Sequence, residues 1–364
     1  MSDNQTLIFY VCIIIVSSIL IFLSELNGGR SVEINYAGKK LCSFKSARSM
    51  ILKTIALIVV IFPLSFRSMK CGADTYMYYS LYRNNTDISY DTFFWLFLKM
   101  MEKIISDPYI GLGIVSAITI IVSYVGLWRM RNNASLSLMF IGYMTCIYFY
   151  SYNYIRMMLA VAFVLVGYTY AIENNRKMTI LFFLIASAIH LSAGTVLFAY
   201  IAIVYISKYK KLITLIILLC VIVFIKFPTF FLSLISIERY KGFIPSDYSQ
   251  ASIGIGTFIK ILPIIIIIIR YNKKFKKQKV WNLFLIFTFL NFAISILGYY
   301  VAVATRLGNV MFVMHLIYIV PWIVRKIKRS REKKILSIIY ICYCFILFEM
   351  LSQNFVTMGI MPYK

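Results

Sequence analysis

The strongest constraint on this chain is the repetition of long apolar segments along almost its whole length. A helix needs about 20 mostly apolar residues to cross the hydrocarbon core of a bilayer. Charged residues make up 14% of the sequence and hydrophobic residues 61%, which leaves too little polar surface for a water-soluble protein. The sequence therefore predicts an all-α fold, a polytopic transmembrane helical bundle. The expected crossings are residues 6–24, 50–66, 109–128, 134–150, 156–172, 211–227, 253–270, 280–302, 307–324 and 335–351.

A further apolar stretch, residues 178–206, is longer than one crossing requires. As a single helix it would be roughly 43 Å long at 1.5 Å per residue, whereas the core is about 30 Å thick. His190 and Gly194 interrupt it near the middle. We therefore expect two short segments, 178–189 and 191–206, that meet at His190, and about 12 membrane crossings in total. A single tilted helix is the alternative.

The net charge of +25 is explained by topology and does not indicate nucleic acid as a partner. Basic residues gather in alternate connections, such as 129–131, 176–177, 273–279 and 325–334, and the positive-inside rule makes these connections cytoplasmic. Both termini and the loops 67–108 and 227–252 then lie on the outer side. Without a linker or an internal repeat, residues 1–364 are expected to form a single integral membrane domain embedded in the lipid bilayer.

Within the first outer loop, residues 91–107 have apolar residues at helical spacing with lysine and glutamate between them. This pattern predicts an amphipathic helix. Such a helix lies on the membrane surface or packs over the bundle, and the sequence does not decide between the two.

The same loop begins with candidate site residues. A glycine at position 72 permits a tight turn before Asp74, and Asp74 is suited to accept a proton, to hold a sugar hydroxyl or to cap a helix. Tyr76 and Tyr79 share a face if the segment is helical, where they either stack on sugar rings or sit at the membrane interface. Arg67 precedes this group.

Two further arginines lie at outer helix ends without an acidic neighbour. Arg156 opens the apolar segment 156–172, and Arg306 lies in an outer turn. A guanidinium binds phosphate through two parallel hydrogen bonds, so both are candidate phosphate ligands. The alternative is an arginine that anchors its helix at the interface.

The remaining candidates are His190, Arg239 and Lys241. A histidine at a helix break near the outer surface is a candidate general base, although a lone histidine on an apolar face often only packs. Arg239 and Lys241 in loop 227–252 either contact an anionic substrate or are solvated charges. The seven cysteines and two histidines lack metal-ligand spacing, so we expect neither a metal site nor a cofactor. Together the residues favour an anionic, lipid-linked substrate, but they do not separate an enzyme from a transporter.

In their order along the chain these residues resemble the EpsG-type family of polysaccharide polymerases, which is akin to the O-antigen polymerases called Wzy. The spacing of Arg156 and Gly167 also resembles the arginine–glycine motif of Wzy outer loops, but only one copy is present. The resemblance extends over roughly residues 60–325. The matching pieces are Arg67, Gly72–Tyr76, Tyr79, Asn153, Arg156, Ala160, His190–Ala193 and Arg306.

The resemblance implies a membrane glycosyltransferase with a GT-C-like fold. Such enzymes join oligosaccharide repeat units carried on undecaprenyl diphosphate, for O-antigen or exopolysaccharide, at the periplasmic face of the bacterial inner membrane. They need no metal or nucleotide sugar, and a chain-length regulator protein is a candidate partner. Carried onto this sequence, Arg156 and Arg306 hold the donor diphosphate with Arg67 in support, and His190 is the base. Asp74 is the alternative base or orients the acceptor. The expected sugar or acceptor contacts are Tyr76, Tyr79, Asn153, Arg239 and Lys241.

Three other functions compete with this one. An O-antigen ligase also uses outer arginines and a histidine, but it usually has a larger outer loop than 227–252. A flippase or transporter of the same lipid-linked units would place charges deep in the bundle. A membrane acyltransferase would use an intramembrane histidine with a donor site on the cytoplasmic side.

Overall fold

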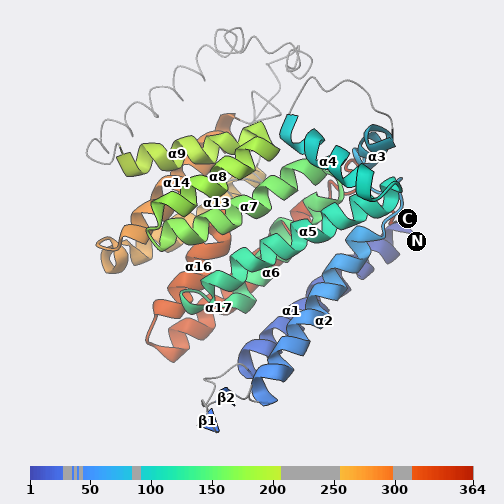
Figure 1. Cartoon of the computed structure of the whole chain (residues 1–364). Helices are drawn as coiled ribbons and strands as arrows, with labels where there is room; N and C mark the ends of the chain where they lie inside the picture. The colour runs from blue at the N-terminus through green and yellow to red at the C-terminus, as the bar shows by residue number, and fades with distance from the viewer. Residues whose placement is uncertain are drawn as a thin grey trace. The chain divides into compact units, whose positions relative to one another are not determined.

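The structure is a computed structural model that describes residues 1–27, 35–36, 39–40, 44–83, 92–205, 255–297 and 314–363 (Figure 1). Its internal contacts divide the chain into two compact units, which are described separately. Unit 1 comprises Met1–Leu191 and Ile317–Lys364, and unit 2 comprises Ser192–Leu316. The single membrane domain expected from the sequence stays a prediction.

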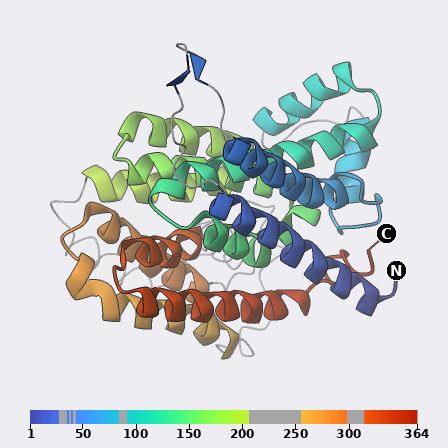
Figure 2. The same ribbon diagram turned by 90° about the horizontal axis from the view of Figure 1, so that it is seen from below.

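Unit 1 is a bundle of long apolar helices. In chain order these are α1 (Asp3–Asn27), α2 (Phe44–Ser65), α5 (Pro108–Arg129), α6 (Leu136–Cys146), α7 (Ile155–Ile172), α8 (Arg176–Ile189), most of α16 (Met314–Lys326) and α17 (Ser330–Ser352). Helix α7 packs between α5 and α8, while α1 and α17 both pack against α6 (Figure 2). The only strands in the described part of the chain are β1 (Asn35–Tyr36) and β2 (Lys39–Lys40), a short antiparallel pair between α1 and α2.

Local sequence signals account for several helix ends. Asp107 caps α5 by accepting a hydrogen bond of 2.8 Å from the N–H of Tyr109, and Pro108 takes the first helical position. Asn175 caps α8 in the same way through the N–H of Met178 at 3.2 Å. The 3-10 helix η1 (Met130–Asn132) makes the tight connection between α5 and α6, and η2 (Tyr148–Tyr152) makes the one between α6 and α7.

The break expected at His190 is confirmed. Helix α8 ends at Ile189, His190 has an extended backbone, and the 3-10 helix η3 (Leu191–Ala193) leads into α9 (Gly194–Tyr205). The single tilted helix is therefore wrong.

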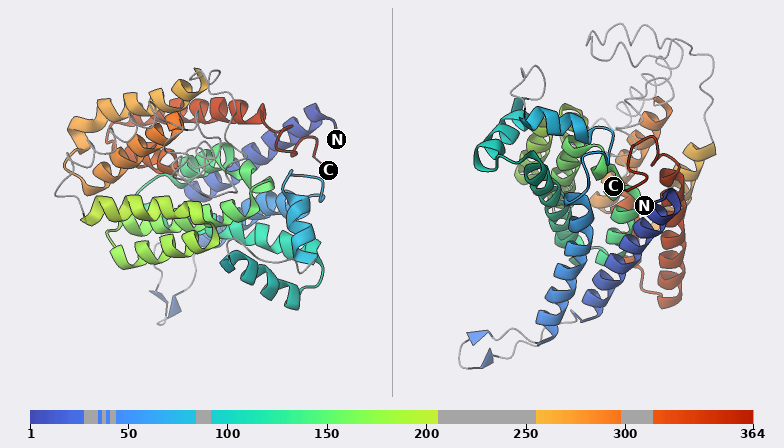
Figure 3. Two further views of the ribbon diagram at one scale, coloured as in Figure 1. Left: turned by 90° about the horizontal axis from the view of Figure 1, so that it is seen from above. Right: turned by 90° about the vertical axis from the view of Figure 1, so that its right-hand side faces the viewer.

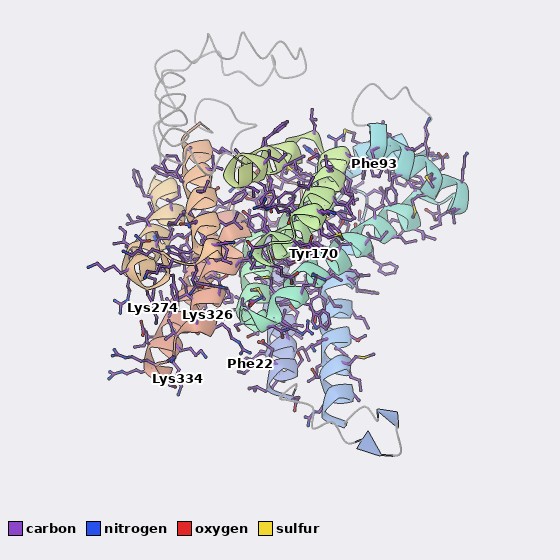
Figure 4. The ribbon with its side chains drawn as sticks, turned by 60° about the vertical axis from the view of Figure 1, so that its left-hand side comes forward. Phe22, Phe93, Tyr170, Lys274, Lys326 and Lys334 are labelled. Atoms are coloured by element: carbon purple, nitrogen blue, oxygen red, sulfur yellow. The ribbon has the colours of Figure 1, made fainter. Side chains whose placement is uncertain are left out.

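Unit 1 has two chemically different ends. At one end, residues 63–75, 109–116, 152–156 and 358–363 are joined by hydrogen bonds, and we call this the Arg67 end. At the other end lie the C-terminus of α1, the N-terminus of α6 and the basic connection between α16 and α17, which we call the Glu25 end. Phe93 lies toward the first end, and Phe22, Lys326 and Lys334 lie toward the second (Figure 4). Within unit 1, the start of the predicted outer loop 67–108 thus lies at the Arg67 end, and the predicted cytoplasmic connection 325–334 lies at the Glu25 end.

The amphipathic helix expected at 91–107 is present as α4 (Thr92–Ile104). Phe94 and Leu98 are buried where α4 packs against α3 (Thr75–Arg83), α5 and α8. Large apolar residues remain exposed along another face of α4, at Phe93, Leu96, Met100 and Ile104. Helix α4 therefore packs over the bundle with one face and leaves an apolar stripe exposed on another, and the contact of that stripe with the membrane surface stays a prediction.

Unit 2 contains α9, α13 (Ile255–Phe275) and α14 (Lys279–Leu297). Helix α14 packs against both α9 and α13. The Trp281 side chain donates a hydrogen bond of 3.0 Å to Asn272 across the turn between α13 and α14.

The structure supports a multi-pass membrane protein. Five described helices are long and apolar enough to cross a bilayer, α1, α2, α5 with η1, α7 and α17, and α6, α9 and α14 contain shorter apolar stretches. Each predicted crossing that falls on described residues coincides with a helix, but the total of about 12 and the GT-C-like fold stay predictions. The segment 211–227 and the loop 227–252 lie outside the described residues.

Candidate functional site

The turn that carries Asp74 is fixed by close backbone contacts at the Arg67 end. Gly72 has a φ of +97°, and a Cβ at this position would collide with the carbonyl oxygen of Tyr152. The Thr75 hydroxyl donates to the same carbonyl at 3.2 Å and to the carbonyl of Cys71 at 2.9 Å. The glycine is therefore required here both for its left-handed conformation and for the absence of a side chain.

Asp74 itself lies half-buried at the start of α3. Its carbonyl accepts the first helical hydrogen bond, from the N–H of Tyr78 at 3.2 Å, so Asp74 occupies the N-cap position. Its own N–H donates to the side-chain oxygen of Asn153 at 2.8 Å. Asn153 is buried, and in this structure its side chain holds the turn by hydrogen bonding to its backbone. The sequence predicted Asn153 as a sugar contact and did not anticipate this bond.

Arg67 is buried beside that turn with an incomplete set of partners. It is 5% exposed, and its Nη1 donates to the carbonyl of Leu64 and to the Ser116 hydroxyl, the latter at 3.1 Å. The guanidinium carbon lies 5.8 Å from the centroid of the Tyr152 ring. Nε and Nη2 have no hydrogen-bond partner among the described residues. A guanidinium with two buried donors left open is costly unless an acceptor reaches it.

The ionisation of Arg67 reflects this setting. Burial lowers the pKa of the guanidinium from its ordinary value, and the thiol of Cys71 and the phenols of Tyr152 and Tyr148 oppose that shift. The described surroundings offer it carbonyl, hydroxyl and aromatic groups, and no ion pair joins it to a described carboxylate.

Arg156 and His190 lie on neighbouring helices of unit 1. Arg156 is half-buried in the first turn of α7, three residues after Asn153. His190 is half-buried at the C-terminus of α8, where its N–H donates to the carbonyl of Ala186 at 2.9 Å. Helix α4 packs against both α3 and α8, the helices next to Asp74 and His190.

The two predicted tyrosines lie on α3 with different exposure. Tyr76 is 67% exposed and Tyr79 is half-buried. Tyr82, one turn further on, is buried and donates to the carbonyl of Ile105 at 2.8 Å, which fixes α3 to the segment that leads into α5. The other three predicted site residues, Arg306, Arg239 and Lys241, lie outside the described residues.

Gly167, the second residue of the arginine–glycine spacing, lies deep in α7. A Cβ there would lie 2.5 Å from the ring of Phe183 in α8. In this structure the glycine permits close packing of α7 against α8, which is the most extensive helix contact of unit 1.

The structure thus brings Arg67, Asp74 and Asn153 close to Tyr152. The Tyr152 ring lies near the Arg67 guanidinium, its carbonyl accepts from Thr75 in the turn that carries Asp74, and Asn153 follows it in the chain. Sequence inspection missed Tyr152, Ser116, Gly359 and Tyr363, all of which contact this group or the elements that hold it. No local sequence pattern identifies these four residues, because their contacts join segments that lie far apart along the chain. Among the described residues no group of three or more His, Cys, Asp or Glu is placed to hold a metal ion.

These helices are typical of a multi-pass membrane protein, and the group around Arg67 and Tyr152 is its candidate site at one end of unit 1. The model of the EpsG family matches residues 50–364, and the chain belongs to that family. No curated protein and no solved structure matches it.

Proposed function

We propose that this protein is a membrane glycosyltransferase that polymerises oligosaccharide repeat units carried on undecaprenyl diphosphate. The reaction would take place at the periplasmic face of the bacterial inner membrane. Membership of the EpsG family over residues 50–364 supports the reaction class. The observation that carries the site is the buried Arg67, with two open donors, next to the turn that presents Asp74.

In the proposed reaction the acceptor sugar hydroxyl attacks the anomeric carbon of the donor sugar. The bond from that carbon to the diphosphate oxygen breaks, and undecaprenyl diphosphate leaves with its negative charge. Arg156 and Arg306 hold the diphosphate, and Arg67 adds fixed positive charge where the negative charge develops, which is commonly the largest catalytic contribution. His190 or Asp74 takes the proton of the acceptor hydroxyl.

Tyr76 is suited to the acceptor because its ring is exposed at the end of the bundle that carries Asp74. Arg239 and Lys241 are proposed as further acceptor contacts. The proposal needs no resident metal, because arginine forks bind diphosphate directly.

The test is complementation of the source bacterium after deletion of this gene, with glycan analysed by gel electrophoresis and normalised to protein amount. Wild type should restore a ladder of repeat units. Asp74→Asn, His190→Ala, Arg156→Lys and Arg306→Lys should each reduce polymer at unchanged protein level. Arg131→Lys is a matched control, since it makes the same chemical change in η1, past the other end of α5 and away from the group around Asp74, and it should retain polymer.

The deletion strain separates the competing functions. A polymerase defect leaves single repeat units, whereas a ligase defect leaves long chains still attached to the lipid carrier. A flippase defect leaves lipid-linked units on the cytoplasmic face, where periodate added to spheroplasts does not reach them. Either of the last two results would exclude the proposed reaction.

A further inference from the structure

The turn that carries Asp74 is held by a second segment from far along the chain. The N–H of Gly72 donates to the carbonyl of Gly359 at 2.7 Å, and the N–H of Ala73 donates to the carbonyl of Met358 at 2.9 Å. These two bonds connect the turn to residues 353–363, which follow α17 and which we call the strap. The donors are the two residues immediately before Asp74, so their position sets the start of α3.

The approach of the strap to the turn depends on a glycine on each side. Gly359 has a φ of +69°, and a Cβ there would lie 2.9 Å from the backbone nitrogen of Ala73. On the other side of the turn, a Cβ at Gly72 would collide with the carbonyl oxygen of Tyr152. The turn is therefore enclosed between the strap and η2, with no space for a side chain at either glycine.

The strap is itself fixed to the ends of α1 and α2. The Tyr363 hydroxyl donates to the carbonyl of Pro63 at 2.9 Å, and its N–H donates to the Thr6 hydroxyl at 2.9 Å. The Tyr10 hydroxyl donates to the carbonyl of Ile360 at 2.6 Å. Figure 3 shows the two terminal segments next to one another at this end.

The Tyr363 ring also connects the strap to the surroundings of Arg67. It lies edge-on to the Tyr152 ring with centroids 6.4 Å apart, and the Tyr152 ring is the one beneath the Arg67 guanidinium. The strap is thus connected to Arg67 through the rings of Tyr363 and Tyr152, and to Asp74 through the backbone hydrogen bonds of Gly72 and Ala73.

We propose that the strap positions Asp74 for the reaction, so that Gly359 and Tyr363 are positioning residues of the same site. This inference rests on the proposed function for the role of Asp74, but the physical hold of the strap on the turn does not. Loosening the strap should move the turn and lower the rate of polymerisation while the helical bundle remains folded.

The experiment uses the full chain with Gly359→Ala, Gly359→Asn and the control Val356→Ala, whose side chain is 61% exposed on the same segment. Two quantities are measured, polymer per protein and the rate at which a maleimide labels the native thiol of Cys71, read by mass spectrometry. Cys71 is fully buried at the base of the turn, so its labelling reports opening of the turn independently of activity.

Alanine and asparagine both place a Cβ against the backbone nitrogen of Ala73, so polymer should fall below wild type in Gly359→Ala and in Gly359→Asn. Cys71 labelling should rise several-fold in both variants, and Val356→Ala should match wild type in both measurements. If Gly359→Ala does not accumulate, Tyr363→Phe replaces it. That change removes one hydrogen bond and should shift both measurements in the same direction by less.

Unchanged Cys71 labelling in the Gly359 variants would show that the strap does not hold the turn. Increased labelling with unchanged polymer would show that the position of the turn does not matter to the reaction. Either result overturns the inference. If wild type itself makes no polymer, the proposed function fails instead, and the labelling still decides whether the strap holds the turn.

Discussion

Glu25 gives the sharpest prediction about what holds unit 1 together. Its carboxylate lies near the end of α1 and accepts hydrogen bonds from the N–H groups of Leu136 at 3.0 Å and Ser137 at 2.9 Å. These are free donors in the first turn of α6, and the N-cap residue Ser135 makes no side-chain cap bond. A distant acidic residue therefore caps α6, and replacing it should weaken the contact between α1 and α6.

The magnitude follows from the two bonds and the helix charge. A hydrogen bond to a charged group contributes about 1.5–3 kcal/mol, and a negative charge at a helix N-terminus about 0.3–1 kcal/mol. Since Glu25 is half-buried, we take the lower part of these ranges for the two bonds and the helix charge, and expect Glu25→Ala to lose about 3–4 kcal/mol. Glu25→Gln keeps one acceptor oxygen and loses the charge, so its loss should be about half as large, ~1–2 kcal/mol.

The assay is thermal unfolding of the detergent-purified protein, followed by size-exclusion chromatography after heating. Such unfolding is often irreversible, so the order of apparent transition temperatures is the informative quantity. The expected order is wild type, then Gln, then Ala. Glu102→Gln on α4, away from this contact, is the control and should match wild type. An Ala variant as stable as wild type would refute the capping role.

Three further predictions follow from the same structure. Arg67→Met should abolish polymer without loss of protein, because an apolar group often replaces a buried charge at little cost; undiminished polymer per protein would contradict the role of its charge. Gly167→Ala should destabilise the protein by about 1–3 kcal/mol, because the added methyl group overpacks against Phe183. Adding Phe183→Leu should restore the melting temperature. An unchanged melting temperature in Gly167→Ala alone would argue against this contact. A spin label on Leu96→Cys in liposomes should be more accessible to oxygen than to a water-soluble nickel complex, and the reverse result would remove α4 from the membrane interface.

The helices, the break at His190 and the side assigned to each loop were predictable from the sequence. Apolar runs gave the helices, because a spanning helix has a length set by the bilayer. The break at His190 was predictable from the excess length of residues 178–206. The grouping of Arg67 with Asp74 and Asn153 followed from alternating loop charge, since that pattern assigned all three to one side.

The contacts that build the site were not predictable in this way. Asn153 binds the backbone of Asp74, a bond between residues 79 positions apart that no local pattern encodes. The strap lies more than 280 positions from the turn it contacts, and Glu25 lies more than 100 positions from the helix it caps. Such pairings depend on which helices pack together, and apolar helices carry little sequence information about their neighbours.

Apart from Arg67 itself, neutral groups make the hydrogen bonds described above for the Arg67 end of unit 1. Tyrosine hydroxyls donate there to the carbonyl oxygens of Pro63, Phe66 and Ile360, and burial raises the pKa of the Tyr363 phenol to about 12. The opposite end relies on charge, as in the pairing of Arg129 with Glu173 at 2.9 Å. Salt and acid weaken ion pairs but leave a phenol–carbonyl bond almost unaffected. The end expected to face outward should therefore keep its geometry in media whose salt and acidity the cell does not control, while the charged contacts lie where the cell regulates both.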